Sequence, residues 1–172
     1  MTTVDIIVAL AVRGQTVATA ESLTGGLLCS TLTSVPGASA VVRGGIVAYA
    51  VDVKAKILNV DVDLLARHGA VDPAVAVHMA IGVRNLLGAT YGVATTGSAG
   101  PDPDPGGTLT GPVPPGLGFV AVAGPHGEVV IGFDYPGQDR EGVRQAAIEA
   151  ALTALRRSLD DAGATDDGRA SV

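Results

Sequence analysis

The feature that most constrains the fold of this chain is a short apolar run that breaks into a polar, glycine-rich turn. Residues 16–19 (Thr-Val-Ala-Thr) lead into residues 20–26 (Ala-Glu-Ser-Leu-Thr-Gly-Gly), and an apolar segment follows at residues 27–29. This pattern is typical of a strand that turns sharply into a helix. Backbone N–H groups and the Ser22 hydroxyl would then lie at a helix N-terminus, where an anion or a developing oxyanion is stabilised. In the alternative, purely structural interpretation, Ser22 or Thr24 caps the helix and the glycines permit close packing.

The same alternation of strand and helix continues along the chain and predicts the fold class. We expect strands over residues 16–19, 45–49, 91–95, 117–123 and 128–134, and helices over 4–12, from 24 onward, 52–58, 61–68, 72–87 and 139–159. Strands that alternate with helices, followed by one late hairpin, predict an α/β fold: a three-layer α/β/α sandwich with a mixed, mostly parallel sheet. We expect residues 1–160 to form a single domain and residues 161–172, which are rich in Asp, Gly and Ala, to form a disordered tail.

Composition narrows the classes of function. A net charge of −6 with only 11 Lys and Arg argues against nucleic acid or an anionic membrane surface as a partner. No apolar stretch approaches the roughly 20 residues of a membrane span, and no cleavable leader is recognisable, so we expect a cytoplasmic protein. The single cysteine and the spacing of the histidines predict no disulfide, no metal site and no bound cofactor. The high apolar content with few charges favours a homo-oligomer.

Two residues are candidates to take a proton from Ser22 if that serine is a nucleophile. Tyr49 ends a predicted strand, and Lys54 lies in the first turns of the next predicted helix. Both would lie at the carboxyl edge of the sheet, where α/β folds bind their ligands and where the Ser22 turn also belongs. A lysine acts as a base only when burial or nearby positive charge lowers its pKa. The alternative is that Lys54 is an exposed helical lysine and Tyr49 a half-buried strand residue.

A second strand end carries another hydroxyl- and glycine-rich turn, at residues 95–101. Its glycines allow backbone N–H groups to approach a phosphate or carboxylate closely, although a loop that needs positive φ would show the same residues. Three arginines are candidates for a phosphate clamp. Arg140 and Arg144 are spaced i, i+4 and share one face of the last predicted helix near its N-terminus, and Arg43 precedes the second predicted strand.

Several segments, taken in order, resemble one family closely, the CinA C-terminal domain family. They are residues 20–26, 35–39, 43–49, 68–71, 96–101 and 139–144. The resemblance covers roughly residues 4–159 and indicates a stand-alone form, because the molybdopterin-binding-like domain fused to some members is not recognisable here. Members include nicotinamide-nucleotide amidohydrolases, which convert nicotinamide mononucleotide to nicotinic acid mononucleotide and ammonia.

The resemblance implies a role for each matching residue. Ser22 corresponds to the family's nucleophile, and Tyr49 and Lys54 to its proton-transfer partners. Backbone N–H groups at Thr24–Gly26 would stabilise the oxyanion, and the turn after the third strand, with an arginine, would bind the phosphate. The substrate-binding residues expected on this basis are Thr24, Gly25, Gly26, Arg43, Thr96, Gly97, Ala99, Gly100, Arg140 and Arg144.

The chain also departs from the family pattern. Ala50-Val51 stands where Ser-Asn is usual, the loop after Pro101 carries extra Asp and Pro residues, and Pro114-Pro115-Gly116 replaces a segment that usually contains lysine. These departures affect the surroundings of the predicted site. They leave open a second class of function, a catalytically weak module that binds a nucleotide or phosphate and acts through a partner or through self-assembly.

Overall fold

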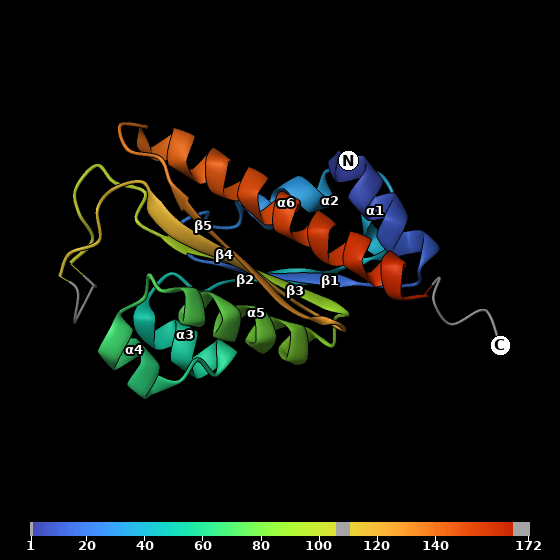
Figure 1. The fold of residues 1–172 in the computed structure, drawn as a ribbon, viewed down its shortest axis with the longest axis horizontal. Helices are drawn as coiled ribbons and strands as arrows, with labels where there is room; N and C mark the ends of the chain where they lie inside the picture. Colours follow the sequence, from blue (N-terminus) through green and yellow to red (C-terminus); the bar gives the residue numbers. More distant parts are fainter. Residues whose placement is uncertain (1, 106–110, 167–172) are drawn as a thin grey trace.

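A five-stranded sheet separates two layers of helices (Figure 1). The computed structural model describes residues 2–105 and 111–166, with side chains up to residue 161. The strands are β1 (Val17–Glu21), β2 (Val42–Val47), β3 (Tyr91–Gly97), β4 (Leu117–Gly124) and β5 (Gly127–Asp134), in the spatial order β2-β1-β3-β4-β5. β2, β1 and β3 are parallel, β4 is antiparallel to β3, and β5 is antiparallel to β4. Four of these five strands therefore point the same way, which confirms the mixed, mostly parallel sheet.

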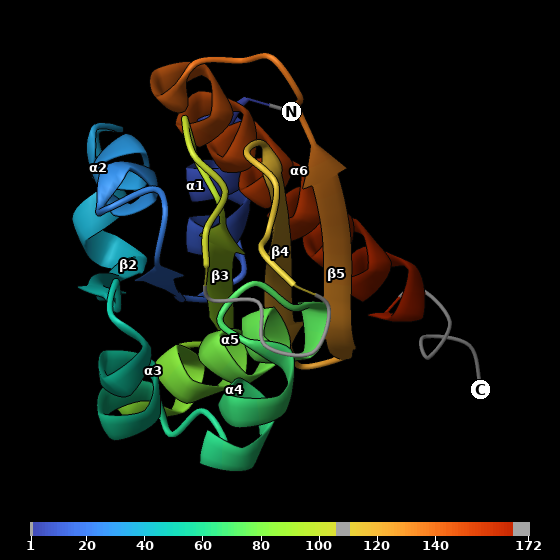
Figure 2. The same ribbon diagram turned by 90° about the vertical axis from the view of Figure 1, so that its left-hand side faces the viewer.

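Helices cover both faces of the sheet (Figure 2). One face carries α1 (Thr3–Val12), α2 (Leu27–Thr33) and α6 (Arg140–Asp166), and the other carries α3 (Val51–Leu58), α4 (Val62–His68) and α5 (Pro73–Leu87). A short 3₁₀ helix, η1 (Ala38–Ala40), connects α2 to β2. This arrangement is the three-layer α/β/α sandwich predicted from the alternation of elements.

Each face of the sheet has its own apolar core, and the two cores differ in the size of the strand residues. On the α1–α2–α6 face the strands contribute larger side chains such as Val17, Tyr91 and Val122. On the α5 face the strands contribute mainly alanines. The small residues allow α5 to lie close to the sheet, and a Cβ added at Gly92 on β3 would overlap the carbonyl oxygen of Ala80. A core without Trp is thus filled by bringing helix and sheet together.

Several boundaries differ from those expected, among them those of β2, α2 and α6. β2 begins at Val42 and ends at Val47, so Tyr49 lies in the connection after the strand. α2 begins at Leu27, because residues 22–26 form a turn in which Gly25 and Gly26 have φ of +61° and +98°. α6 continues to Asp166, beyond the end expected at residue 159. The disordered tail over residues 161–172 stays a prediction, and residues 167–172 lie outside the described part.

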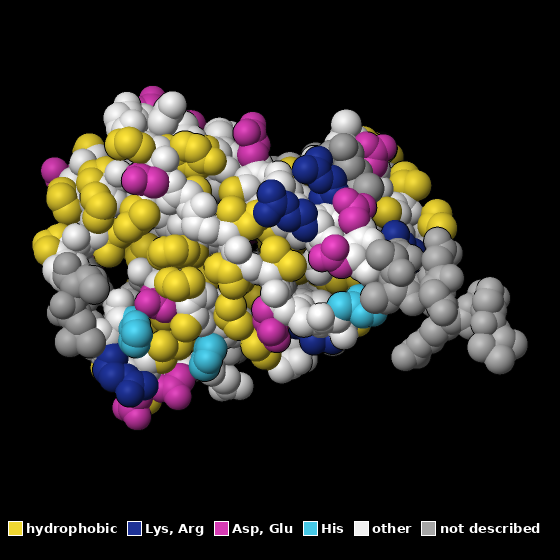
Figure 3. Space-filling model, viewed as in Figure 1, with side chains coloured by type: hydrophobic (Ala, Val, Ile, Leu, Met, Phe, Trp, Pro, Cys, Tyr) yellow, Lys and Arg dark blue, Asp and Glu magenta, His cyan; other side chains and the backbone are white. Residues whose placement is uncertain are grey.

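The segments that follow β1, β2 and β3 meet at one edge of the sheet, near the start of α6 (Figure 2). This is the carboxyl edge at which the sequence places the candidate residues. Elsewhere, the face drawn in Figure 3 carries Lys and Arg in small separate groups among apolar and acidic side chains. In the described ranges, no helix combines the length and the apolar character that crossing a membrane requires.

Candidate active site

Ser22 is the first residue beyond β1 and lines a cavity of about 290 Å³ at the carboxyl edge of the sheet. Its backbone N–H donates to the carbonyl oxygen of Thr95 on β3 at 3.0 Å, which fixes the serine against the end of the central strand. The residue is only 8% exposed. The cavity is lined by residues 22, 23, 49, 51, 70, 71, 96–100, 102, 104, 105 and 140.

Lys54 contacts Ser22 from beneath the cavity. It is the fourth residue of α3, and its side chain is completely buried, contrary to the exposed helical lysine of the alternative interpretation. Its Nζ donates to Ser22 Oγ at 2.9 Å, to the carbonyl oxygen of Ala48 at 2.6 Å and to that of Tyr49 at 3.1 Å. Burial lowers the pKa of Lys54 to about 8, and the negative charge of Asp104 partly opposes this shift.

These contacts suit a neutral amine. A deprotonated lysine keeps two N–H groups, which the two carbonyl oxygens of Ala48 and Tyr49 can accept. The nitrogen lone pair is then left for the hydroxyl of Ser22, 2.9 Å away. The arrangement can therefore remove a proton from Ser22.

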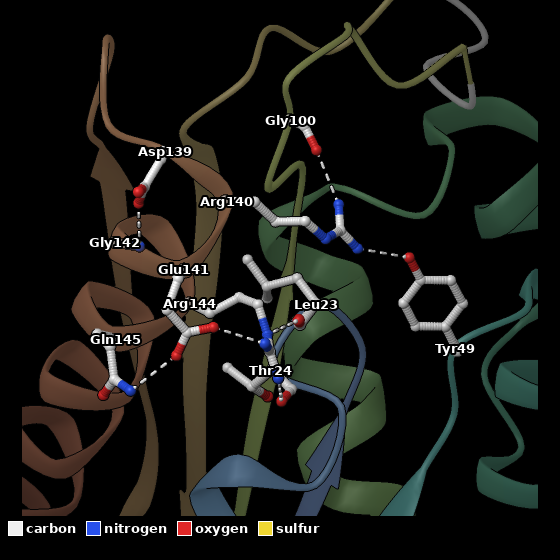
Figure 4. Close-up of polar contacts among 10 residues, drawn as sticks. All are labelled: Leu23, Thr24, Tyr49, Gly100, Asp139, Arg140, Glu141, Gly142, Arg144 and Gln145. Carbon is white, nitrogen blue, oxygen red and sulfur yellow. Dashed lines mark hydrogen bonds and ion pairs between the residues drawn. The ribbon is translucent and has the colours of Figure 1, made fainter.

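The side chain of Tyr49 lies at the rim of the cavity and is 60% exposed. Its hydroxyl accepts a hydrogen bond from Arg140 Nη2 at 3.1 Å (Figure 4). The phenol is thus bonded to an arginine of α6, whereas the contact between Tyr49 and Lys54 is made by the backbone carbonyl. Tyr49 borders the same cavity as Ser22, but in this structure its hydroxyl belongs to the rim.

In the turn after Ser22, the N–H groups of both glycines donate hydrogen bonds within the protein. Gly25 N–H donates to the carbonyl oxygen of Ser22 at 3.1 Å, and Gly26 N–H donates to the Glu21 carboxylate at 2.9 Å. Both donors already have acceptors in this structure, so it offers no support for an oxyanion site at these two glycines. Leu23 and Thr24 have N–H groups without an acceptor within residues 2–105 and 111–166. Leu23 also lines the cavity, directly after Ser22.

The glycines have a conformational role in this turn. Their positive φ values reverse the chain between β1 and α2, a conformation in which a Cβ would be strained. Thr24 is wholly buried, and its hydroxyl is 2.8 Å from that of Thr95. Residues 24–26 thus support the turn and do not line the cavity.

Glu21 is a functional residue that sequence reasoning missed. Its carboxylate is 1% exposed and accepts hydrogen bonds from the backbone N–H groups of Gly26, Leu28 and Cys29 at 2.9, 3.0 and 2.7 Å. The Thr19 hydroxyl also donates to it, at 3.3 Å. Glu21, and neither Ser22 nor Thr24, therefore caps the N-terminus of α2. An acidic residue directly before a Ser-x-Thr-Gly-Gly turn was the available signal.

The end of β3 and the turn after it form a wall of the cavity and contribute Thr96, Gly97, Ala99 and Gly100. The Thr96 hydroxyl donates to the carbonyl oxygen of Ala70 at 2.6 Å, which ties the connection between α4 and α5 to this wall. A Cβ at Gly97 would lie 2.9 Å from Gly118 Cα on β4, so the close pairing of β3 and β4 requires glycine there.

The three candidate arginines have different surroundings. Arg140 lines the cavity, and besides Tyr49 it donates to the carbonyl oxygen of Gly100 at 2.8 Å. Arg144 donates to the carbonyl oxygens of Leu23 and Thr24 at 3.2 and 3.0 Å (Figure 4). Arg43 lies near the start of β2, at the opposite edge of the sheet, and donates to the carbonyl oxygen of Leu87. Of the three, Arg140 alone lines the cavity, and the placement of Arg43 and Arg144 in a phosphate clamp is not supported.

The loop after Pro101 adds acidic groups to the cavity that were not assigned to the site. Asp102 and Asp104 both line it. Backbone hydrogen bonds in both directions join Asp104 to Val113 at 2.9 and 2.8 Å, so this part of the loop is held in place. Throughout the described ranges, no three His, Cys, Asp or Glu side chains are grouped in a way that could hold a metal ion.

Comparison with known proteins identifies the family to which the chain belongs. The model of the CinA C-terminal domain matches residues 2–159. The chain belongs to the CinA C-terminal domain family. A CinA-like protein of Frankia casuarinae is 52% identical over 150 residues, which are 86% of this chain and 32% of that protein. A CinA-like protein of Anaeromyxobacter dehalogenans is 49% identical over 156 residues, 90% of this chain and 37% of that protein. The chain thus spans about a third of the length of these curated relatives.

Solved structures support the assignment of the fold. The competence/damage inducible protein CihA of Agrobacterium tumefaciens superposes with a TM-score of 0.82 at 36% identity, covering 92% of this chain and 93% of that one. A CinA superfamily protein of Klebsiella pneumoniae superposes with a TM-score of 0.84 at 31% identity, covering 92% and 96%. This CinA domain brings Ser22, Tyr49, Arg140 and residues 96–100 to one cavity, with buried Lys54 in contact with Ser22.

Proposed function

We propose that this CinA domain is an amidohydrolase that converts nicotinamide mononucleotide to nicotinic acid mononucleotide and ammonia. The observation that carries the proposal is the 2.9 Å contact between Ser22 Oγ and a buried Lys54 whose pKa is lowered to about 8, beside an open cavity. A serine and a lysine in hydrogen-bond contact form a nucleophile and base of the kind used in acyl transfer. The substrate is the one that the family resemblance implies.

In the first half of the reaction Ser22 is acylated. Neutral Lys54 takes the proton from Ser22 Oγ as that oxygen attacks the carboxamide carbon, which forms the C–O bond and places negative charge on the former carbonyl oxygen. The intermediate then collapses as its C–N bond breaks. Protonated Lys54 returns the proton to the leaving nitrogen, so ammonia departs and an ester on Ser22 remains.

The second half regenerates the enzyme. Water attacks the ester carbon and gives a proton to Lys54, and the C–O bond to Ser22 breaks as the proton passes to Ser22 Oγ. The oxyanion of both intermediates needs N–H donors, and we assign the Leu23 N–H to this role because Leu23 follows the nucleophile directly and lines the cavity. In this scheme the N–H groups of Leu23 and Thr24 replace those of Gly25 and Gly26.

The size and charge of the cavity support a mononucleotide. A volume of about 290 Å³ is near the lower end of the range for small-ligand sites, roughly 300–1,000 Å³. Arg140 is placed on the rim by its bonds to Gly100 and Tyr49, and its guanidinium is the group that would receive the phosphate. Tyr49 acts in this scheme with Arg140, in substrate binding.

Release of ammonia from nicotinamide mononucleotide tests the proposal. We expect turnover by the wild type and a loss of at least about a thousandfold in Ser22→Ala. Ser30→Ala, at an exposed serine of α2, is the matched control and should keep full activity. Absence of ammonia release by the wild type would exclude this reaction, whereas full activity of Ser22→Ala would leave the reaction standing and exclude Ser22 as nucleophile.

A second function is favoured by the bonding of the rim. Because the Tyr49 hydroxyl pairs with Arg140 rather than with Ser22 or Lys54, the cavity could bind a phosphate-bearing nucleotide with weak turnover. Tight binding of nicotinamide mononucleotide by the wild type, without release of ammonia, would support this binding module.

A further inference from the structure

Charged groups of both signs line the cavity. Arg140 comes from α6, and Asp102 and Asp104 come from the loop after β3. Ser22 follows β1 directly and contacts Lys54 of α3. A ligand in this cavity would thus meet the positive charge of Arg140 and the negative charge of the aspartates.

Asp104 is the better placed of the two aspartates to act at the reaction centre. Its negative charge reaches Lys54, whose pKa it raises against the effect of burial, and Ser22 is 2.9 Å from the same amine. Asp104 is also half-buried, whereas Asp102 is exposed. A charge at this position acts on the ligand as well as on the amine, because both would lie beside the same wall of the cavity.

We propose that Asp104 selects substrates whose carboxamide is carried on a positively charged ring, a pyridinium, over neutral aromatic amides of the same shape. This inference rests on the proposed function and names the feature of the substrate that the site reads. Nicotinamide mononucleotide is a zwitterion in this respect, with an anionic phosphate suited to Arg140 and a cationic ring suited to the wall that holds Asp104. The loop has a fixed backbone at this point, because Asp104 and Val113 exchange two backbone hydrogen bonds.

The charge of the ring would also help the base. Asp104 favours the protonated form of Lys54, which cannot accept the proton of Ser22. A cation placed beside Asp104 offsets its field at the amine, so a pyridinium substrate increases the share of neutral Lys54 when it binds. A neutral aromatic amide lacks this effect, and it also leaves the charge of Asp104 without a counterpart in the ligand.

Equilibrium binding to the Ser22→Ala protein tests the inference without turnover. The two probes are nicotinamide mononucleotide and the carbon-linked analogue in which benzamide replaces the pyridinium, so that only the ring charge differs. We expect the cationic compound to bind about tenfold more tightly, and we expect Asp104→Asn in the same background to remove this preference while affinity for the neutral compound stays within twofold. Asp104→Glu, which keeps the charge, should retain the preference.

The matched control is Asp102→Asn, on the same loop but at an exposed position, which should keep at least half of the preference. Equal affinity of the two compounds, an unchanged preference in Asp104→Asn, or a preference lost only in Asp102→Asn would each overturn the inference while leaving the amidase reaction standing. A clear preference with no ammonia release by the wild type would instead overturn the reaction and leave the selection of a cationic ring. Circular dichroism of each variant shows whether its fold is retained.

Discussion

The turn after β1 and the loop after β3 look alike in sequence but are built in opposite ways. Both follow central strands, and both are rich in glycine and hydroxyl groups. In the first turn the protein itself takes most polar groups: Glu21 accepts the Gly26 N–H, and Arg144 donates to two backbone carbonyl oxygens. The end of β3 and the loop after it instead line the cavity, with residues 96–100, 102 and 104.

The first region holds the proposed nucleophile, and the second borders the volume in which a ligand would bind. The first turn fixes Ser22 relative to Lys54, and chemistry on Ser22 needs a placement that does not vary. The second segment borders the volume that a substrate would occupy and carries the groups that read its shape and charge. Changes in the first region should therefore act on the rate or on folding, and changes in the second on affinity and selectivity.

The largest effect is expected from Lys54→Met, which removes the base that contacts Ser22 of the first turn. The amine contacts Ser22 Oγ directly, so we expect kcat for ammonia release to fall by about a thousandfold or more with little change in KM. In the wild type kcat should rise with pH through about 8, because neutral Lys54 is the active form and burial lowers its pKa to that value. Steady-state kinetics from pH 6 to 10 measure both effects.

Lys56→Met is the matched control for this comparison. Lys56 is exposed on the same helix and pairs with Asp52 at 2.8 Å, so its loss should leave kcat and the pH profile unchanged. A Lys54→Met protein that keeps its kcat, or a wild-type rate that falls as pH rises through 8, contradicts the assignment of Lys54 as base.

The next largest effect is expected on stability, from Glu21→Gln. Three backbone N–H groups converge on this buried carboxylate, and a glutamine offers a single acceptor oxygen and brings an N–H₂ group toward those donors. At least one buried donor then loses its partner, so we expect the free energy of unfolding to fall by about 2–3 kcal/mol. Urea unfolding measures this.

Glu128→Gln, at an exposed position of β5, provides the comparison and should change the free energy of unfolding by less than about 0.5 kcal/mol. Equal stability of the two variants would mean that the first turn does not depend on its carboxylate cap. The contrast between the two regions would then lose its physical basis.

Much of the fold could be predicted because local rules and packing agree. The Asp72-Pro73 start of α5 is capped as expected, with Asp72 accepting from Ala74 N–H at 2.8 Å, and the β4–β5 hairpin forms where predicted. The start of β2 was misplaced, because the pair Gly44-Gly45 suggests a turn. A Cβ at Gly45 would overlap the Thr19 hydroxyl, so glycine is required here by packing between β1 and β2. The sequence pattern alone does not reveal this contact.

The sequence motifs indicated which residues form the candidate site, but not their burial or their hydrogen-bond partners. Ser22, Tyr49 and Lys54 stood out, but the burial of Lys54 did not, since a neighbouring Lys56 suggested an exposed helix face. The acceptors of Lys54 include two backbone carbonyl oxygens, which no side-chain pattern reveals. The sequence did not reveal that the Gly26 N–H donates to the Glu21 carboxylate, so it suggested Gly26 as an oxyanion donor.

The smallest effects are expected from the two arginines of α6, each of which serves one of the two regions. Spacing i, i+4 places Arg140 and Arg144 on one helix face, yet Arg140 bonds to Gly100 beside the cavity and Arg144 to the carbonyls of the first turn (Figure 4). Arg140→Met should therefore raise KM for nicotinamide mononucleotide about 10- to 100-fold, with unchanged stability and no change in KM for the phosphate-free riboside.

Arg144→Met should instead lower the free energy of unfolding by about 1–2 kcal/mol, with KM within threefold. The two variants are matched in chemistry, so an exchange of their effects would show that the first turn binds the ligand and that the loop after β3 is the support.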